Sequence, residues 1–253
     1  MTLHVDRHGE GPALLLLHGW GMHGGAWDEL LPALAGRFRV HVADLPGHGN
    51  SASTRCAAFD DAVDAVAAIL PPGAIVCGWS LGGLVAQRLA IRHAALVRAM
   101  LLVASTPCFV QRADWTHAMS AATLDSFARG LEEDPGGTLQ QFVRLNALHG
   151  AASREAIRAF VARLAARGLP PPAGLRESLG WLRDADLRAD AARIAVPTVL
   201  VHGARDMLTP VAGARWLAAT IPDARLVEIE DAAHLPFFTH RAALVAALQS
   251  LHG

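Results

Sequence analysis

The sequence predicts an α/β fold, a mostly parallel and doubly wound sheet with one helical insertion. Short apolar runs alternate with helical patterns in the first part of the chain and again near its end. Between these parts, about 80 residues show helical periodicity and no convincing strand. The Ala13–Leu17 run is apolar throughout, as in a parallel strand that is buried on both faces. We therefore expect a core of residues 1–107 and 191–253, with residues 108–190 inserted as a helical lid.

Each expected element follows from its local pattern. Strands are predicted for the short apolar runs Ala13–Leu17, Arg39–Ala43, Ala74–Cys77, Ala99–Ala104, Thr198–His202 and Arg225–Ile229. Core helices are predicted, from apolar residues at helical spacing, over Gly25–Leu34, Asp60–Leu70, Leu81–His93, Val211–Thr220 and Arg241–Leu251. The clearest helices of the insertion are Leu139–Leu148, Ser153–Arg167 and Leu175–Leu182. Because the strands are expected to be parallel, their carboxyl ends should meet at one edge of the sheet.

The composition excludes several classes of protein. Of the 253 residues, 52% are hydrophobic and 18% are charged, which excludes a disordered chain. The 22 basic residues, all of them arginine, balance 23 acidic residues, so the charge does not favour nucleic acid as the main partner. The three cysteines form no CxxC pair and are too few for a disulfide framework.

The sequence also lacks the signals of a membrane protein or a cofactor enzyme. Its first residues are polar, and no apolar run approaches the roughly 20 residues that span a bilayer. It has no GxGxxG after a strand, no phosphate loop and no HExxH pair. We therefore expect a cytoplasmic protein that needs neither cofactor nor metal. A monomer is the default expectation, because no feature of the sequence indicates an oligomer.

The main chemical signal is the segment Gly78–Gly82, whose sequence GWSLG has the form GxSxG. It follows a predicted strand and precedes a predicted helix, which is the context of a nucleophile elbow. Glycine tolerates the close backbone contacts of such a turn, and Gly83 extends the run of small residues. Ser80 is therefore the candidate nucleophile. The Leu81 N–H, at the helix N-terminus, would face a developing oxyanion.

A serine nucleophile needs a base, and in this kind of sheet an acid and then a histidine follow it in the chain. Asp206 lies just beyond one predicted strand, and His234 lies just beyond the next. Both would share the sheet edge of Ser80, with His234 as the general base and Asp206 orienting its imidazole. His202, inside an apolar strand, is expected to be a packed core histidine. Weaker alternatives for the acid are Asp184, Asp186 and Asp231.

A second oxyanion donor is expected from the loop His18–Gly21, whose sequence is HGWG. The loop follows the first long strand, and its glycines would let it approach Ser80 closely. The Trp20 N–H would then act beside that of Leu81, and loss of one such donor costs about 3 kcal/mol of transition-state stabilisation. The alternative is a glycine-rich turn that binds nothing.

Four segments together carry a family resemblance. They are His18–Met22 (HGWGM), Asp44–Gly49 (DLPGHG), Gly78–Val85 (GWSLGGLV) and Ser105–Phe109 (STPCF), the last followed by Asp114–Trp115. The chain resembles the α/β-hydrolase superfamily and, within it, the pimeloyl-[acyl-carrier protein] methyl ester esterases of biotin synthesis. The resemblance implies a four-helix lid over the site. It also implies hydrolysis of a methyl ester at the far end of a pimeloyl chain held by a carrier protein.

The resemblance further implies that a short lid-helix segment and Trp20 contact the acyl chain. Residues 142–146 (FVRLN) match that segment, with Phe142 and Leu145 similar in character and Arg144 and Asn146 different. The implied contacts to the substrate are therefore Trp20, Phe142, Val143, Arg144, Leu145 and Asn146.

The charge of the insertion suits an acidic carrier protein as partner. Residues 137–176 hold six arginines and one acid, a local charge of +5 (six minus one) in a chain of net charge −1. Arg154 and Arg158 are i, i+4 neighbours on one predicted helix face, so they are the candidate carrier contacts. Such a patch would speed association and weaken with salt. The alternative is a solvated helix face.

The leading hypothesis is a serine carboxylesterase that acts on pimeloyl-carrier methyl ester through an acyl-enzyme. A broad short-chain carboxylesterase is the first alternative, as is a lactonase or carbon–carbon hydrolase of the same fold. An inactive hydrolase-fold module would usually lack one of Ser80, Asp206 and His234, and all three are present.

Overall fold

The structure, a computed structural model, describes residues 2–147, 150 and 154–252. Within these residues a seven-stranded sheet has the order β1-β3-β2-β4-β5-β6-β7. The strands are β1 (Val5–His8), β2 (Ala13–Leu17), β3 (Arg39–Ala43), β4 (Ala74–Trp79), β5 (Val97–Val103), β6 (Thr198–Gly203) and β7 (Ala224–Ile229). The pairs are parallel except for β1 with β3. The predicted mostly parallel α/β sheet is thus confirmed.

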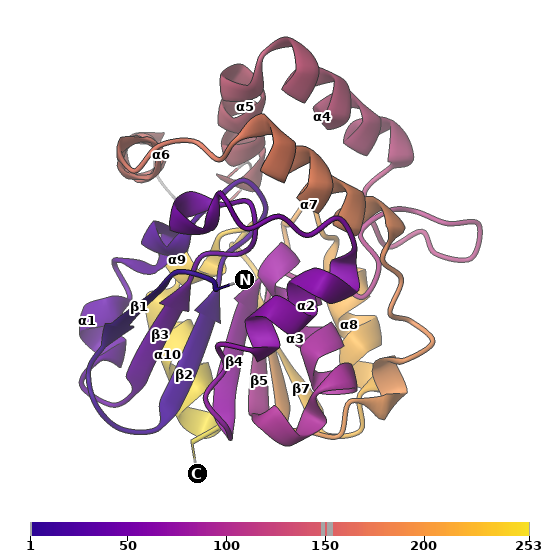
Figure 1. The fold of residues 1–253 in the computed structure, drawn as a ribbon. Coiled ribbons are helices and arrows are strands. Elements are labelled where there is room, and N and C mark those ends of the chain that lie inside the picture. Colours follow the sequence, from indigo (N-terminus) through magenta and orange to yellow (C-terminus); the bar gives the residue numbers. More distant parts are fainter. Residues whose placement is uncertain (1, 148–149, 151–153, 253) are drawn as a thin grey trace.

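The central strands are apolar on both faces because helices cover both faces of the sheet. Every residue of β2 and of β4 is buried. In Figure 1, α2 (Phe59–Ala67) and α3 (Leu81–Arg92) lie in front of the sheet, and α10 (Arg241–Ser250) lies behind it. The remaining core helices are α1 (Leu31–Leu34), α8 (Val211–Thr220) and α9 (Pro236–Thr239).

Three parts of the core differ from the prediction, and one of them is α9, which no predicted helix covers. The helix expected over residues 25–34 is divided into a 3-10 turn, η1 (Gly24–Trp27), and α1. Pro32 explains this division, because proline has no N–H to donate and is favoured in the first turn of a helix. β1 has no counterpart in the prediction, because its sequence VDRH lacks an apolar run and lies partly exposed at the sheet edge.

Four helices lie between β5 and β6 and cover the carboxyl edge of the sheet (Figure 1). They are α4 (Ala121–Glu133), α5 (Pro135–Ala147), α6 (Arg154–Ala166) and α7 (Pro172–Asp184). The last three correspond to the predicted helices, although the expected boundaries Leu148 and Ser153 lie outside the described residues. Helix α4 was not singled out by the sequence pattern; its N-cap is Ser120, whose hydroxyl accepts from the Thr123 N–H.

Among the helices that the structure describes, none combines the length and the apolar character needed to cross a membrane.

Candidate active site

Ser80 stands on a sharp turn between β4 and α3. Its backbone has φ 53° and ψ −115°, a conformation that residues other than glycine rarely adopt. The turn is possible because its neighbours are glycines: a Cβ on Gly78 would lie 2.3 Å from the Gly82 carbonyl oxygen. A Cβ on Gly82 would in turn lie 2.3 Å from the carbonyl oxygen of Leu17. The elbow therefore sits directly against the end of β2.

The two predicted oxyanion donors belong to the elbow and to the loop that follows β2. Leu81 is the first residue of α3, where helix N–H groups lack intrahelical acceptors. Trp20 follows the end of β2 in the loop that the elbow approaches, and its indole Nε1–H donates to the Leu175 carbonyl oxygen of α7 at 3.1 Å. The side chain of Trp20 is thus held by the insertion.

Two buried histidines support the loop that carries Trp20. His48 Nε2 accepts from the Gly21 N–H at 3.3 Å, and His18 Nε2 accepts from the Leu45 N–H at 2.9 Å. Burial lowers the pKa of His18 and of His48 to about 3. Both imidazoles are therefore neutral at ordinary pH, as an acceptor nitrogen requires.

Asp206 and His234 are joined by a short hydrogen bond. The carboxylate oxygen Oδ2 of Asp206 lies 2.7 Å from His234 Nδ1, and both side chains are fully buried. Thr209 Oγ1 donates to the same oxygen at 2.7 Å, while the Leu208 and Thr209 N–H groups donate to Oδ1 at 2.9 Å. Burial alone would raise the pKa of the Asp206 carboxyl, but the nearby His234 and His202 and the hydrogen bonds from His234 and the Thr209 N–H hold it below its ordinary value.

Thr209 is a part of this site that the sequence analysis did not identify. The sequence signal that could have identified it is local. An aspartate often accepts hydrogen bonds from the N–H groups two and three residues further along the chain, and Thr209 is the third residue after Asp206. The other candidate acids lie elsewhere. Asp184 pairs with Arg183 at 2.8 Å, and Asp231 pairs with His240 at 3.0 Å. Asp186 pairs with Arg188 at 2.6 Å.

His202 lies next to the pair and has the environment of a core residue. Its Nε2 lies 2.6 Å from the Thr209 carbonyl oxygen and 3.5 Å from Asp206 Oδ2. Burial lowers the pKa of His202, so it stays neutral and donates to the carbonyl.

The backbone of His234 is held from two sides. Its N–H donates to the Asn146 carbonyl oxygen of α5 at 3.1 Å, and its own carbonyl oxygen accepts from Trp79 Nε1 at 2.9 Å. The other imidazole nitrogen, Nε2, is buried and has no hydrogen-bond partner among the described residues. That nitrogen is therefore the one available for proton transfer.

Residues 142–146 run through the last turns of α5, next to Trp20. The Phe142 ring meets the Trp20 indole edge-on, with centroids 4.8 Å apart. Val143 and Asn146 are buried and Leu145 is half-buried, whereas Arg144 is exposed. Asn146 Nδ2 donates to the Phe142 carbonyl oxygen at 2.6 Å, and its buried Oδ1 has no hydrogen-bond partner in the described part of the chain.

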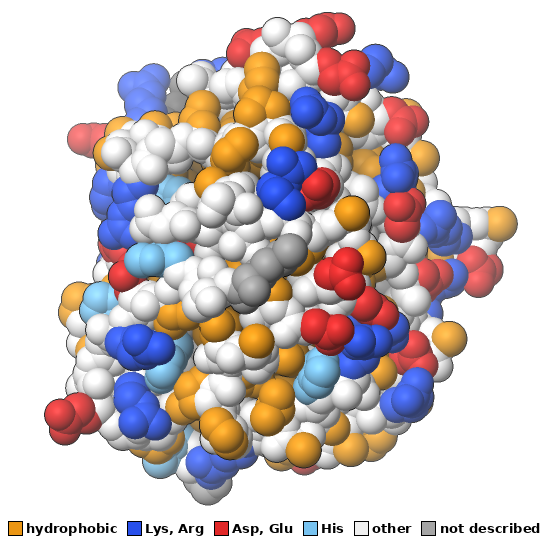
Figure 2. All heavy atoms as spheres, viewed as in Figure 1, with side chains coloured by type: hydrophobic (Ala, Val, Ile, Leu, Met, Phe, Trp, Pro, Cys, Tyr) orange, Lys and Arg blue, Asp and Glu red, His pale blue; other side chains and the backbone are white. Residues whose placement is uncertain are grey.

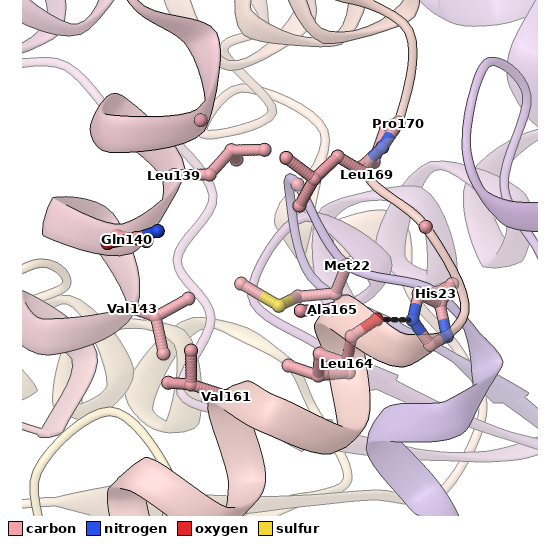
Figure 3. Close-up of a pocket in the computed structure, with 13 residues that line it drawn as sticks. Met22, His23, Leu139, Gln140, Val143, Val161, Leu164, Ala165, Leu169 and Pro170 are labelled. Atoms are coloured by element: carbon pink, nitrogen blue, oxygen red, sulfur yellow. Dashed lines mark hydrogen bonds between the residues drawn. The ribbon is translucent and has the colours of Figure 1, made fainter.

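An apolar pocket of about 260 Å³ lies between the Trp20 loop and the insertion. Figure 3 shows side chains from the loop, from α5, from α6 and from the segment after α6 turned toward this shared space. They include Met22, Leu139, Val143, Val161, Leu164 and Leu169. The His23 Nε2–H donates to the Leu164 carbonyl oxygen at 3.0 Å, since His23 Nδ1 accepts from the Gly25 N–H. This hydrogen bond, dashed in Figure 3, closes one side of the pocket.

The arginines of the insertion do not all face solvent freely. Arg163 of α6 pairs with Glu29, and Arg167 pairs with Asp28 at 2.9 Å. These ion pairs join α6 to the core and reduce the local positive charge. Arg158 is exposed on the same helix, and the side chain of Arg154 lies outside the described residues. Figure 2 shows basic side chains gathered where α6 lies in Figure 1.

Within the described ranges, no group of three or more histidine, cysteine, aspartate or glutamate side chains is placed to hold a metal ion.

Comparisons with known proteins find α/β hydrolases and esterases. A family model for the alpha/beta hydrolase fold matches residues 12–241. A pimeloyl-[acyl-carrier protein] methyl ester esterase from Chromobacterium violaceum is 42% identical, over 98% of this chain and 97% of its own length. The enzyme of that name from Nitrosomonas europaea is 40% identical, over 99% of each chain. Among solved structures, an esterase from Exiguobacterium antarcticum superposes with a TM-score of 0.90 at 22% identity, over 99% of this chain and 96% of that one.

Proposed function

The chain belongs to the α/β-hydrolase family and to its pimeloyl-[acyl-carrier protein] methyl ester esterases, and we propose that it hydrolyses the methyl ester of pimeloyl-[acyl-carrier protein]. The products are methanol and a pimeloyl-carrier protein whose far end is a free carboxylate. The observation that carries the proposal is the full-length similarity to esterases of that name. The Asp206–His234 pair beside the Ser80 elbow supplies the chemistry.

Ser80 is the proposed nucleophile, and His234 is its base. Ser80 Oγ attacks the ester carbonyl carbon while His234 Nε2 takes the hydroxyl proton. The carbonyl oxygen becomes an oxyanion, which the Leu81 and Trp20 N–H groups stabilise; each donor is worth about 3 kcal/mol in such a site. The intermediate then collapses, the carbon–oxygen bond to the methoxy group breaks, and His234 returns the proton to give methanol.

Water completes the cycle. The acyl-enzyme holds the pimeloyl chain as an ester of Ser80, and His234 Nε2 takes a proton from the water molecule that attacks the acyl carbon. The bond from that carbon to Ser80 Oγ then breaks, His234 returns the proton to Oγ, and the free carboxylate is released. Asp206 holds Nδ1 protonated throughout and stabilises the imidazolium that forms in each half-reaction. Side chains, main-chain N–H groups and water are sufficient for every step, so the proposal requires neither metal nor cofactor.

The acyl chain is proposed to run from Ser80 past Trp20 into the apolar pocket. The pocket is contiguous with the oxyanion loop, because Gly21 and Met22 line it together with Val143 of α5. Its apolar lining suits methylene groups rather than a charged substrate. Phe142 and Leu145 flank the same helix face, and the buried Asn146 amide lies one turn further along α5. Arg144, which is exposed, would meet the carrier end of the substrate rather than the ester.

The acidic carrier protein is proposed to dock on α6. Arg158 is exposed there, and Arg154 begins the same helix. Arginine binds phosphate and carboxylate groups with paired hydrogen bonds, which suits an acidic partner. We also propose a cytoplasmic enzyme that acts as a monomer; the proposed Ser80, Asp206 and His234 triad needs no residue from a second chain.

The test is hydrolysis of methyl pimeloyl-carrier protein, at low and at high salt, beside a short p-nitrophenyl ester. We expect rapid turnover of the carrier substrate, a fall with salt, and loss of both activities in Ser80→Ala. Turnover of the short ester alone would make the chain a broad short-chain carboxylesterase. Full activity of Ser80→Ala would show that the assignment of the nucleophile is wrong.

A further inference from the structure

Trp79 connects three parts of the active site, one through its backbone and two through its indole. Trp79 ends β4 and directly precedes Ser80, so its backbone belongs to the elbow. Its Nε1–H donates to the His234 carbonyl oxygen at 2.9 Å. Its six-membered ring lies against Gly19 of the oxyanion loop, where an added Cβ would come within 3.1 Å of Cε3. One residue thus joins the nucleophile, the oxyanion loop and the loop of the base.

The imidazole of His234 needs such support because it is fixed at one nitrogen. Nδ1 is bonded to Asp206, whereas Nε2 has no partner among the described residues. The polar contacts of the ring, with Asp206 at 2.7 Å and with Thr209 Oγ1 at 3.2 Å, are both at Nδ1. They allow the ring to tilt about that nitrogen, and a shift of the loop would move Nε2 away from Ser80. The backbone hydrogen bonds of His234, to Asn146 and from Trp79, limit that shift.

These two backbone anchors belong to different parts of the fold. Asn146 lies in α5, a helix of the insertion. Trp79 belongs to a central strand, is fully buried, and packs against Phe237 with ring centroids 4.7 Å apart. The Trp79 hydrogen bond is therefore the anchor that the sheet itself provides.

We propose that Trp79 is a positioning residue, which keeps the His234 imidazole in register with Ser80 through the hydrogen bond from its indole N–H. The inference rests on the proposed function, because it requires His234 to be the base. Trp79 donates to the His234 carbonyl oxygen, and its indole also packs beside the imidazole, with ring centroids 5.8 Å apart. Its effect should fall on kcat, since the ground-state binding surface of the substrate is unchanged.

Trp79→Phe removes the N–H donor, and the chain offers a matched control in Trp27→Phe. Trp27 is also fully buried and packs on the same Phe237 ring, with centroids 4.8 Å apart. Its Nε1, however, has no hydrogen-bond partner within the described residues. We expect Trp79→Phe to lower kcat for a short p-nitrophenyl ester at least about tenfold, with KM unchanged within about twofold. Trp27→Phe should keep kcat within about twofold of wild type.

The comparison is made per active site, counted by stoichiometric labelling with a fluorophosphonate, so that unfolded protein does not count as slow catalysis. A second variant keeps the shape: 3-benzothienylalanine at position 79 replaces the N–H by sulfur and retains the two fused rings. A similar loss of kcat in this variant supports the proposal. Wild-type kcat in it, or equal losses at positions 79 and 27, would overturn the proposal alone. No ester hydrolysis by the wild-type chain would overturn the proposed function as well.

Discussion

Asp206 Oδ2 lies 2.7 Å from His234 Nδ1, and this contact decides which nitrogen of the imidazole is left for Ser80. A carboxylate accepts only, so Nδ1 must carry the proton and Nε2 must be the base. Thr209 Oγ1 donates to the same carboxylate oxygen and keeps it aimed at the ring. The assignment of roles in the proposed mechanism follows from this one geometry.

Asp206→Asn should therefore lower kcat for a p-nitrophenyl ester by about 10⁴-fold. The amide can donate to Nδ1, which stabilises the tautomer whose Nε2 is already protonated. Thermal unfolding and kinetics are measured together, because a folded protein with little activity is the expected result. Asp184→Asn is the control: Asp184 is exposed and paired with Arg183, so its loss should leave kcat within about twofold of wild type. A folded Asp206→Asn enzyme with near-wild-type kcat would contradict the assignment.

Stability should fall as the pH is lowered through 6.5, because of His18 and His48. In the folded protein burial lowers the pKa of each to about 3, whereas both regain the ordinary value of 6.5 on unfolding. At pH 5 the unfolded chain therefore binds two protons that the folded chain does not, and stability rises with pH. Each of the two histidines should lower the free energy of unfolding by about 2 kcal/mol between pH 7 and pH 5.

Urea unfolding at pH 7 and at pH 5 measures this difference. His48→Gln keeps an acceptor for the Gly21 N–H but cannot be protonated. On acidification its free energy of unfolding should therefore fall by about 2 kcal/mol less than that of the wild-type protein. The same loss in both proteins would mean that His48 does not contribute.

Reversing one exposed charge on α6 should affect the carrier substrate alone. Arg158→Glu places a carboxylate where the acidic carrier protein is proposed to dock, so kcat/KM for methyl pimeloyl-carrier protein should fall about tenfold at low salt. The short ester should be hydrolysed at the wild-type rate. Arg39→Glu makes the same charge change at the start of β3, at the opposite edge of the sheet, and should leave both substrates unaffected. Equal effects of the two variants would argue against docking on α6.

Filling the apolar pocket should separate long substrates from short ones. Val161→Trp adds an indole to a wall of the pocket, whose volume is about 260 Å³. We expect KM for the carrier substrate to rise about tenfold, because displaced methylene groups lose burial, while the acetate ester keeps its KM. A series of p-nitrophenyl esters of increasing chain length measures this. A loss that is the same for acetate and for long chains would indicate general damage to the insertion.

The sequence indicates the parts of the candidate site that depend on chain order, and it carries no signal for those that depend on packing. Ser80, Asp206 and His234 could be placed because each follows a strand of a parallel sheet, and such strands end at one edge. The contact between Asn146 and His234 joins residues far apart in the chain through backbone atoms, which leave no pattern in the sequence.

The charge of the insertion, counted from the sequence, is likewise only a partial guide to the charge of its surface, because packing pairs some of the arginines. Counting arginines in the insertion predicted a strongly positive surface, but Arg163 and Arg167 pair with Glu29 and Asp28 of the core. Their partners lie more than a hundred residues away in the chain, so only the fold brings them together. The arginines that remain for a partner are fewer than the composition suggests.

The hydrogen bond from the His234 N–H to the Asn146 carbonyl oxygen also constrains how this enzyme can diverge. The acceptor is a main-chain atom, so almost any side chain at position 146 would supply it. What must be retained is the length of α5 and the place where its last turn meets the core. The insertion can therefore change its residues freely to suit new acyl groups, but a one-residue insertion or deletion in α5 would withdraw support from the base. Grafting the insertion from a distant relative should succeed or fail on helix length rather than on sequence identity.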